Sequence, residues 1–169
     1  MTIIIAGLSE VPKLVASRAP SHLITLLDPA TMIETPDGIA PERHLKLGVN
    51  DIAEATEGLI VPDEALVARV LAFGATWDEA TPMLIHCWAG ISRSTASAFL
   101  LACERNPHVS ERQIALAMRA SAPHAFPNRK IVALADDVLC RAGRMMDAVE
   151  AMGEFDWRVA APFDFAVRY

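Results

Sequence analysis

Five residues separate Cys87 from Arg93 in the run His-Cys-Trp-Ala-Gly-Ile-Ser-Arg-Ser, which occupies positions 86–94. The apolar run Met83–Ile85 precedes it, and an apolar, helix-like stretch follows it to Ala102. A strand, a tight loop of small residues and a helix together form an anion-binding cradle, because loop amides point inward and the helix N-terminus adds partial positive charge. The spacing therefore predicts an anion site with a thiol and a guanidinium in it.

The residue types in this loop, called the signature loop below (86–94), favour one kind of anion. A thiol is a poor nucleophile until it ionises, and a helix N-terminus beside a guanidinium favours the thiolate. The planar fork of Arg93 can bind two oxygens of a tetrahedral oxyanion, which a lysine cannot do. Gly90 allows a sharp turn with no β-carbon in the way of a ligand. A phosphate monoester above the Cys87 thiolate fits all three features.

The pattern His-Cys-x-x-Gly-x-Ser-Arg-Ser resembles the signature of the cysteine-dependent protein tyrosine phosphatases, and specifically that of their dual-specificity branch. The tyrosine-specific branch more usually has Gly-Arg-Thr where this chain has Ser92-Arg93-Ser94. Neither Cys103 nor Cys140 has an arginine at the same offset. The resemblance implies a phosphatase that works through a cysteinyl-phosphate intermediate, and we expect no metal and no cofactor.

The resemblance also implies roles for the loop residues. Cys87 is the expected nucleophile, and Arg93 and the loop amides are expected to bind the phosphate through the residues Trp88, Ala89, Gly90, Ile91, Ser92 and Arg93. Ser94 is expected to donate its hydroxyl to the sulfur anion, the alternative being an ordinary hydroxyl at a helix start. Adjacent side chains on a strand point to opposite faces, so His86 is expected to order the loop rather than to reach the sulfur or bind a metal.

A proton donor for the leaving oxygen is the second requirement of this chemistry. In the family it is an aspartate on a mobile loop, a few tens of residues before the cysteine and just after a strand. Asp51 fits, because it lies 36 residues upstream (87 − 51 = 36). Asp63 follows Pro62, where it suits helix capping, and Asp37 lies in a Pro-Asp-Gly turn. We therefore assign Asp51 as the acid, on an acid loop spanning about residues 50–62.

Downstream, Pro127-Asn128 resembles a segment that follows the signature helices in dual-specificity phosphatases, which extends the resemblance to residues 44–140. Asn128 is expected either to buttress the acid loop or to cap the final helix.

The elements around these residues alternate between strands and helices. Strands are expected at 3–5, 23–27, 44–49 and 83–85, and helices at 9–17, 63–73, 94–102, 110–120 and 129–152, with Ser110 and Gln113 as a capping box. This alternation predicts an α/β three-layer sandwich with a mostly parallel central sheet, the protein tyrosine phosphatase-like fold. At 169 residues, one domain over 1–169 is expected.

Composition restricts the partners and the compartment. A net charge of −6 argues against nucleic acid, and no apolar stretch approaches the roughly 18 residues that span a membrane. The N-terminus lacks the basic region of a signal peptide. Three cysteines without paired spacing favour a reducing, cytoplasmic setting. We expect Cys103 and Cys140 to be buried and inert, the alternative being a protective disulfide with Cys87.

The expected partner is a phosphorylated protein or a small phosphomonoester. Phosphotyrosine, alone or together with phosphoserine and phosphothreonine, is the preferred substrate. The aromatic phosphotyrosine-recognition loop of the tyrosine-specific branch cannot be identified, because Tyr169 is the one tyrosine of the chain. The signature loop has no lysine, which weakens an inositol phosphate or lipid substrate. A phosphate-binding module, an arsenate reductase and a sulfurtransferase remain as alternatives on the same cradle. The aromatic C-terminal tail (153–169) is expected either to pack on its own domain or to dock a partner or second subunit.

Overall fold

A five-stranded sheet forms the centre of the structure, a computed structural model that describes residues 1–169. The strand order is β3-β2-β4-β1-β5, and the strands are β1 (Thr2–Gly7), β2 (His22–Leu27), β3 (His44–Gly48), β4 (Met83–Cys87) and β5 (Phe163–Ala166). The first four are parallel, and β5 runs antiparallel along β1. Every residue of β2 and β4 is buried, as expected for inner parallel strands that are covered on both faces.

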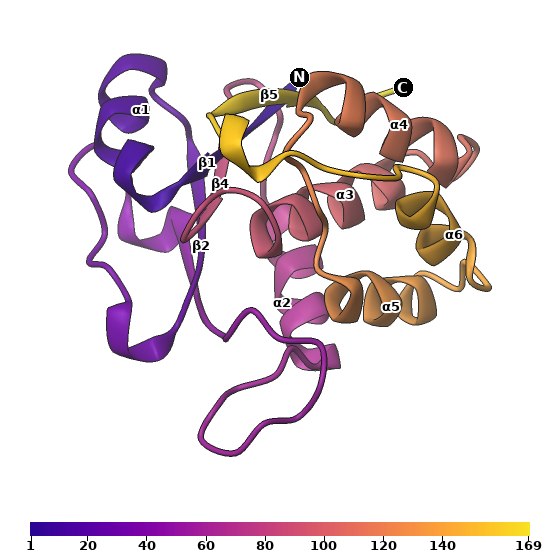
Figure 1. Cartoon of the computed structure of the whole chain (residues 1–169). Coiled ribbons are helices and arrows are strands. Elements are labelled where there is room, and N and C mark those ends of the chain that lie inside the picture. Colours follow the sequence, from indigo (N-terminus) through magenta and orange to yellow (C-terminus); the bar gives the residue numbers. More distant parts are fainter.

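Helices cover both faces of the sheet unequally (Figure 1). One face carries α1 alone, over a small core that includes Ile4, Leu14 and Leu23. The other face carries the remaining helices over a large core centred on Phe99. The helices are α1 (Val11–Arg18), α2 (Glu64–Ala75), α3 (Arg93–Arg105), α4 (Glu111–Ser121), α5 (Arg129–Val138) and α6 (Arg144–Glu150). The predicted three-layer α/β sandwich is therefore confirmed.

The C-terminal ends of the four parallel strands meet at one edge of the sheet, which is where α/β folds place their ligands. There β4 ends at Cys87 and runs through the signature loop into α3. Strand β3 ends at Gly48 and leads into the acid loop, while β1 ends at Gly7 beneath the signature loop. This edge therefore brings together segments that are far apart in the sequence.

Two expectations about helices were wrong. The expected helix over 129–152 is two helices, α5 and α6, because the chain between them takes positive φ at Cys140, Ala142 and Gly143. Asp136 stabilises this break by accepting hydrogen bonds from the amides of Gly143 and Met145 at the start of α6. At α4, Ser110 is the N-cap residue, but its side chain makes no capping hydrogen bond.

Most of the other local expectations are confirmed, with Cys140 as the exception. The Asp63 side chain caps α2 by accepting a 2.9 Å hydrogen bond from the Leu66 amide. All three cysteines are free; Cys103 is buried, as expected, but Cys140 is exposed, so the expectation of two buried thiols was wrong for Cys140. Much of the C-terminal tail packs on its own chain, since β5 pairs with β1 and Phe165 is fully buried. None of the helices combines the length and the apolar character needed to cross a membrane.

Candidate active site

The backbone of the signature loop is arranged to receive an anion. None of the amides of residues 88–93 donates a hydrogen bond within the chain, and α3 begins at Arg93. Six consecutive free N–H groups at a helix N-terminus are the donors that an oxyanion requires.

Close packing against β1 fixes the shape of this loop. Gly90 has a φ of +75°, and a β-carbon there would lie 2.6 Å from the carbonyl carbon of Ala6. The Leu8 amide donates a 3.0 Å hydrogen bond to the Trp88 carbonyl. A β-carbon at Gly7 would lie 3.2 Å from that same carbonyl oxygen. Glycine at position 90 is therefore required both by its conformation and by its contact with β1.

Cys87 lies at the base of the loop, with only 2% of its surface exposed. Its Sγ is 3.2 Å from the hydroxyl oxygen of Ser94, which lies in the first turn of α3. Because a hydroxyl can donate to a sulfur anion, Ser94 is placed to stabilise a thiolate at Cys87.

The Arg93 guanidinium is buried and held from one side. Its Nη1 donates a 2.8 Å hydrogen bond to the Val49 carbonyl, at the end of β3. Its Nε is buried without a hydrogen-bond partner. The anchored Nη1 leaves the opposite edge of the fork, Nε and Nη2, free to bind two oxygens of one anion.

Asp51 reaches the signature loop from the acid loop. Its Oδ1 accepts hydrogen bonds from the Ser92 hydroxyl at 2.7 Å and from the Asn128 amide group at 2.8 Å. Its Oδ2 lies 3.8 Å from Nε of Arg93 and accepts no hydrogen bond. One carboxylate oxygen is thus used for positioning, while the other remains available to carry a proton beside the cradle.

Asn128 makes both of the contacts that were expected as alternatives, one with the acid loop and one as a helix cap. Its Nδ2 donates to Asp51 in the acid loop, and its Oδ1 accepts a 3.1 Å hydrogen bond from the Ile131 amide, which caps α5. The backbone N–H of Asn128 donates a 3.2 Å hydrogen bond to the Ser92 carbonyl. Asn128 therefore joins the acid loop, the signature loop and α5.

His86 is buried next to Cys87, and neither of its ring nitrogens makes a hydrogen bond to the sulfur. Its Nδ1 lies 3.3 Å from the carbonyl oxygen of Cys87, and its Nε2 lies 2.7 Å from the Thr25 hydroxyl on β2. Burial lowers the pKa of His86 to about 4. The ring is therefore neutral near pH 7 and contacts the backbone at Cys87, as expected for a residue that orders the loop.

The chain is similar in fold to several solved structures. DUSP15 has a TM-score of 0.64 and 18% identity, and the match covers 88% of each chain. Human DUSP28 has a TM-score of 0.58 and 17% identity, over 82% of this chain and 92% of that one. PTPMT1, in complex with PI(5)P, has a TM-score of 0.57 and 16% identity, over 82% of this chain and 90% of that one. The fold is that of the dual-specificity phosphatases. No protein-family model and no curated protein matches this sequence.

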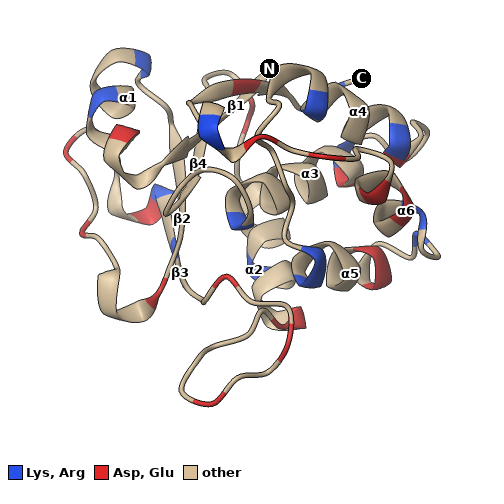
Figure 2. Cartoon of the chain, in the orientation of Figure 1, with Lys and Arg blue, Asp and Glu red and all other residues tan.

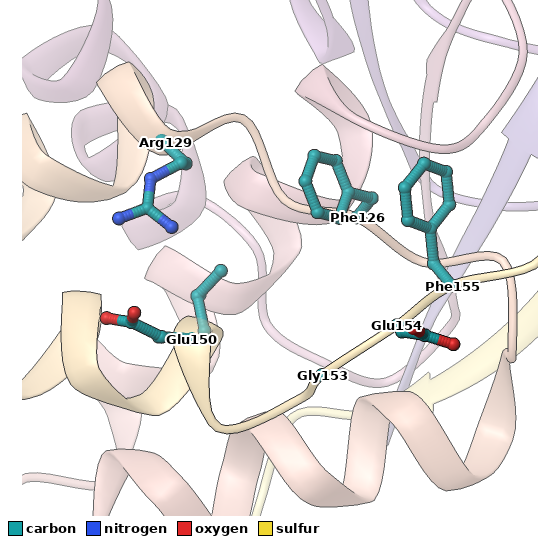
Figure 3. Close-up of a pocket in the computed structure, with 7 residues that line it drawn as sticks. Phe126, Arg129, Glu150, Gly153, Glu154 and Phe155 are labelled. Atoms are coloured by element: carbon teal, nitrogen blue, oxygen red, sulfur yellow. The ribbon is translucent and has the colours of Figure 1, made fainter.

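Within this phosphatase fold, a cavity of about 520 Å³ lies between the segment that precedes α5, the end of α6 and the start of the C-terminal tail (Figure 3). The Phe126 amide donates a 2.9 Å hydrogen bond to the Ile91 carbonyl, which joins the cavity wall to the loop. Phe126 stacks on Phe155 of the C-terminal tail, with ring centroids 4.3 Å apart. The full lining is Phe126, Arg129, Val149, Glu150, Gly153, Glu154 and Phe155. Trp88 is 61% exposed, so most of its surface faces solvent.

Several residues that support the site were not predicted from the sequence. Gly7 lies against the loop, Thr25 and His44 connect to His86, and Val49 binds Arg93 through its backbone carbonyl. No local motif marks a carbonyl contact. The polar Thr25 in the middle of an otherwise apolar strand is the one signal that could have been noticed.

Proposed function

We propose that this protein hydrolyses phosphate monoesters through a cysteinyl-phosphate intermediate at Cys87. The observation that carries the proposal is the arrangement around its sulfur. The Ser94 hydroxyl lies 3.2 Å away, the amides of residues 88–93 are free, and Asp51 stands 3.8 Å from the Arg93 guanidinium. This arrangement supports the assignment of a nucleophile, an oxyanion site and a proton donor to one site.

In the first step, the Cys87 thiolate attacks phosphorus in line with the leaving oxygen. The S–P bond forms as the P–O bond breaks, while the loop amides and Arg93 hold the three equatorial oxygens. Asp51, protonated on Oδ2, gives its proton to the leaving oxygen, so that the product departs as an alcohol or phenol.

In the second step, water hydrolyses the cysteinyl-phosphate. Asp51, now a carboxylate, removes a proton from the water as its oxygen attacks phosphorus. The S–P bond breaks and inorganic phosphate forms. The Ser94 hydroxyl donates to the departing thiolate and makes it a better leaving group.

Phosphorylated protein, bearing phosphotyrosine or phosphoserine and phosphothreonine, is the substrate class that we favour. Arg93 is the only cationic side chain of the signature loop, and the acid loop contributes Asp51, Glu54 and Glu57 with no lysine or arginine (Figure 2). Substrates with several phosphates, such as inositol polyphosphates, are repelled by this negative surface. The hydrogen bond from the Phe126 amide to the Ile91 carbonyl supports the expectation that residues beside a phosphorylated side chain contact the cavity at Phe126 and Phe155.

A phosphoinositide is the second candidate substrate, because a solved structure with a similar fold, PTPMT1, is in complex with PI(5)P. A single cationic fork is sufficient for one phosphate group of such a lipid. Parallel assays with phosphopeptides, inositol phosphates and phosphoinositide vesicles distinguish the two classes. For a phosphopeptide substrate, Phe155→Ala should raise KM for phosphopeptides while leaving KM for p-nitrophenyl phosphate unchanged.

Hydrolysis of p-nitrophenyl phosphate tests the reaction itself. We expect turnover that vanadate inhibits, because vanadate resembles the trigonal-bipyramidal transition state. Cys87→Ser should abolish turnover, and Arg93→Lys, which keeps the charge but loses the fork, should lower kcat/KM about a hundredfold. A phosphate-binding module would bind vanadate without turnover, and an arsenate reductase or sulfurtransferase would leave the phosphate ester intact. Turnover by Cys87→Ser at the unmutated rate would rule out the proposed nucleophile.

A further inference from the structure

A buried row of hydrogen bonds runs across three strands to the base of the signature loop. The Thr35 hydroxyl lies 2.9 Å from Nδ1 of His44, and Nε2 of His44 lies 2.7 Å from the Thr25 hydroxyl. The same hydroxyl lies 2.7 Å from Nε2 of His86, whose Nδ1 is 3.3 Å from the Cys87 carbonyl oxygen. The row therefore connects the surface segment before β3 with the backbone of Cys87.

Donor and acceptor chemistry gives this row a single direction. A carbonyl oxygen only accepts, so Nδ1 of His86 carries the proton and Nε2 of the neutral ring is bare. Thr25 must then donate to His86, and its oxygen accepts from a protonated Nε2 of His44. Nδ1 of His44 is consequently bare and accepts from Thr35.

Burial keeps both rings in this state. Thr25 and His86 are fully buried and His44 is 8% exposed. Desolvation is the main cause that lowers the pKa of His44 and of His86 to about 4. Lys46 adds to this effect at His44, and the charges of His44 and Arg93 add to it at His86, whereas Glu34 at His44 and the Cys87 carbonyl at His86 act in the opposite direction. Neutral rings with one proton each are the forms that the row requires.

We propose that Thr25 and His44 are positioning residues that set the tautomer of His86 and, through it, the orientation of the Cys87–Trp88 peptide. This rests on the proposed function of Cys87. In a trans peptide the C=O and the following N–H point in opposite directions. Holding the Cys87 carbonyl on His86 therefore fixes the direction of the Trp88 N–H, the first free amide of the loop. Without the Thr25 hydroxyl, Nε2 of His86 has no donor and the ring can take the other tautomer.

Thr25→Val removes the hydroxyl and keeps the shape of the side chain, and Thr25→Ser restores the hydroxyl. The first readout is the pH profile of Cys87 alkylation by iodoacetamide, followed at the Cys87 peptide by mass spectrometry in a Cys140→Ser background. It requires no turnover, so its outcome is separate from that of the phosphatase assays. We expect Thr25→Val to move the midpoint up by roughly one pH unit, because a weaker set of donors favours the thiolate less.

The second readout is turnover of p-nitrophenyl phosphate. Thr25→Val should lower kcat/KM about tenfold, which corresponds to a shift of one pH unit in the alkylation midpoint. Thr25→Ser should restore both the midpoint and kcat/KM. His44→Phe keeps Thr25 but removes the ring that donates to its hydroxyl. It should raise the alkylation midpoint and lower kcat/KM, each by less than Thr25→Val does. An unchanged profile in Thr25→Val, or equal shifts in the valine and serine variants, would overturn the proposal.

Nitrogen NMR of the histidine rings tests the direction of the row in the unmutated protein, even if Thr25→Val fails to fold. We expect a proton on Nδ1 of His86 and on Nε2 of His44 at about pH 7. The opposite tautomer at His86 would contradict the proposal.

Discussion

The signature loop and the acid loop carry the two halves of the proposed chemistry, but they are built in opposite ways. The signature loop is fixed by close packing at Gly90 and by hydrogen bonds from Leu8, Phe126 and Asn128 to its carbonyls. In the acid loop every residue from 53 to 60 is exposed. An anion site works best when its donors are already in place, whereas a proton donor on a loop can move to admit the substrate.

The acid loop is nevertheless tethered at its base. The Asn50 amide donates to the Ile60 carbonyl at 2.9 Å, and its side-chain oxygen accepts from the Ile60 amide at 2.8 Å. Its Nδ2 also donates to Asp28, after the end of β2. Asp51 thus follows a fixed residue and precedes an exposed span, so its position depends on its contacts with Ser92 and Asn128.

Gly90→Ala should have the largest effect among the variants that leave the reacting side chains unchanged. The new β-carbon would approach the Ala6 carbonyl carbon to 2.6 Å at a positive φ, so either the loop or the end of β1 must move. We expect kcat/KM for p-nitrophenyl phosphate to fall at least about a hundredfold and the free energy of unfolding to fall by about 3 kcal/mol. Urea unfolding measures the second value. Near-native turnover would show that the loop is less constrained than its packing indicates.

Asn128→Asp separates the two roles of Asn128. The carboxylate can still accept from the Ile131 amide, so α5 should keep its cap, but it cannot donate to Asp51 and adds a like charge beside it. We expect kcat to fall by about tenfold or more, with little change in the free energy of unfolding. Asn128→Ala should lower both kcat and stability, the latter by about 1 kcal/mol. A normal kcat in Asn128→Asp would mean that the residue acts only as a cap.

The two loops were also unequally predictable from the sequence. The spacing from Cys87 to Arg93 is local, and the strand and helix on either side follow from short apolar runs, so the signature loop could be placed from nine residues. Asp51 was found by its distance from Cys87 and its place after a strand, which required the resemblance to a family.

Features that depend on tertiary contact could not be predicted. The Thr25–His86 contact requires the pairing of β2 with β4, whose residues lie 61 positions apart. The break between α5 and α6 depends on positive φ at Cys140 and Ala142, which are not glycines, as well as at Gly143. Gly143 was the one sign of the break in the sequence, and the apolar periodicity running on to Met152 outweighed it. These contacts, rather than the motif, decide how rigidly each loop is held.

The histidines beneath the signature loop make its support sensitive to acid. Burial lowers the pKa of His44 and of His86 from 6.5 to about 4. As pH falls below 6.5, the unfolded chain takes up protons before the folded one, so stability decreases between pH 6.5 and about 4. We expect the free energy of unfolding to be lower at about pH 5 than at about pH 7 by on the order of 1 kcal/mol for each ring.

Urea unfolding at the two pH values measures this difference. His44→Gln should reduce it, because one of the buried rings is removed. The matched control is His108→Gln, whose ring is exposed between α3 and α4 and which should leave the difference unchanged. Equal differences in the unmutated protein and in His44→Gln would show that His44 does not contribute to the acid sensitivity.

Gly58→Ala should have the smallest effect, and it is the matched counterpart of Gly90→Ala. Gly58 has a φ of +76°, almost that of Gly90, but a β-carbon there would meet nothing within 4 Å. The substitution therefore adds conformational strain of about 1–2 kcal/mol without a clash, and the exposed loop can relieve it by changing shape. We expect kcat for p-nitrophenyl phosphate to change by less than about threefold, with cooperative unfolding retained. A loss of kcat in Gly58→Ala as large as that in Gly90→Ala would show that the backbone of the acid loop is as fixed as that of the signature loop. The inferred difference in rigidity between the two loops would then be wrong.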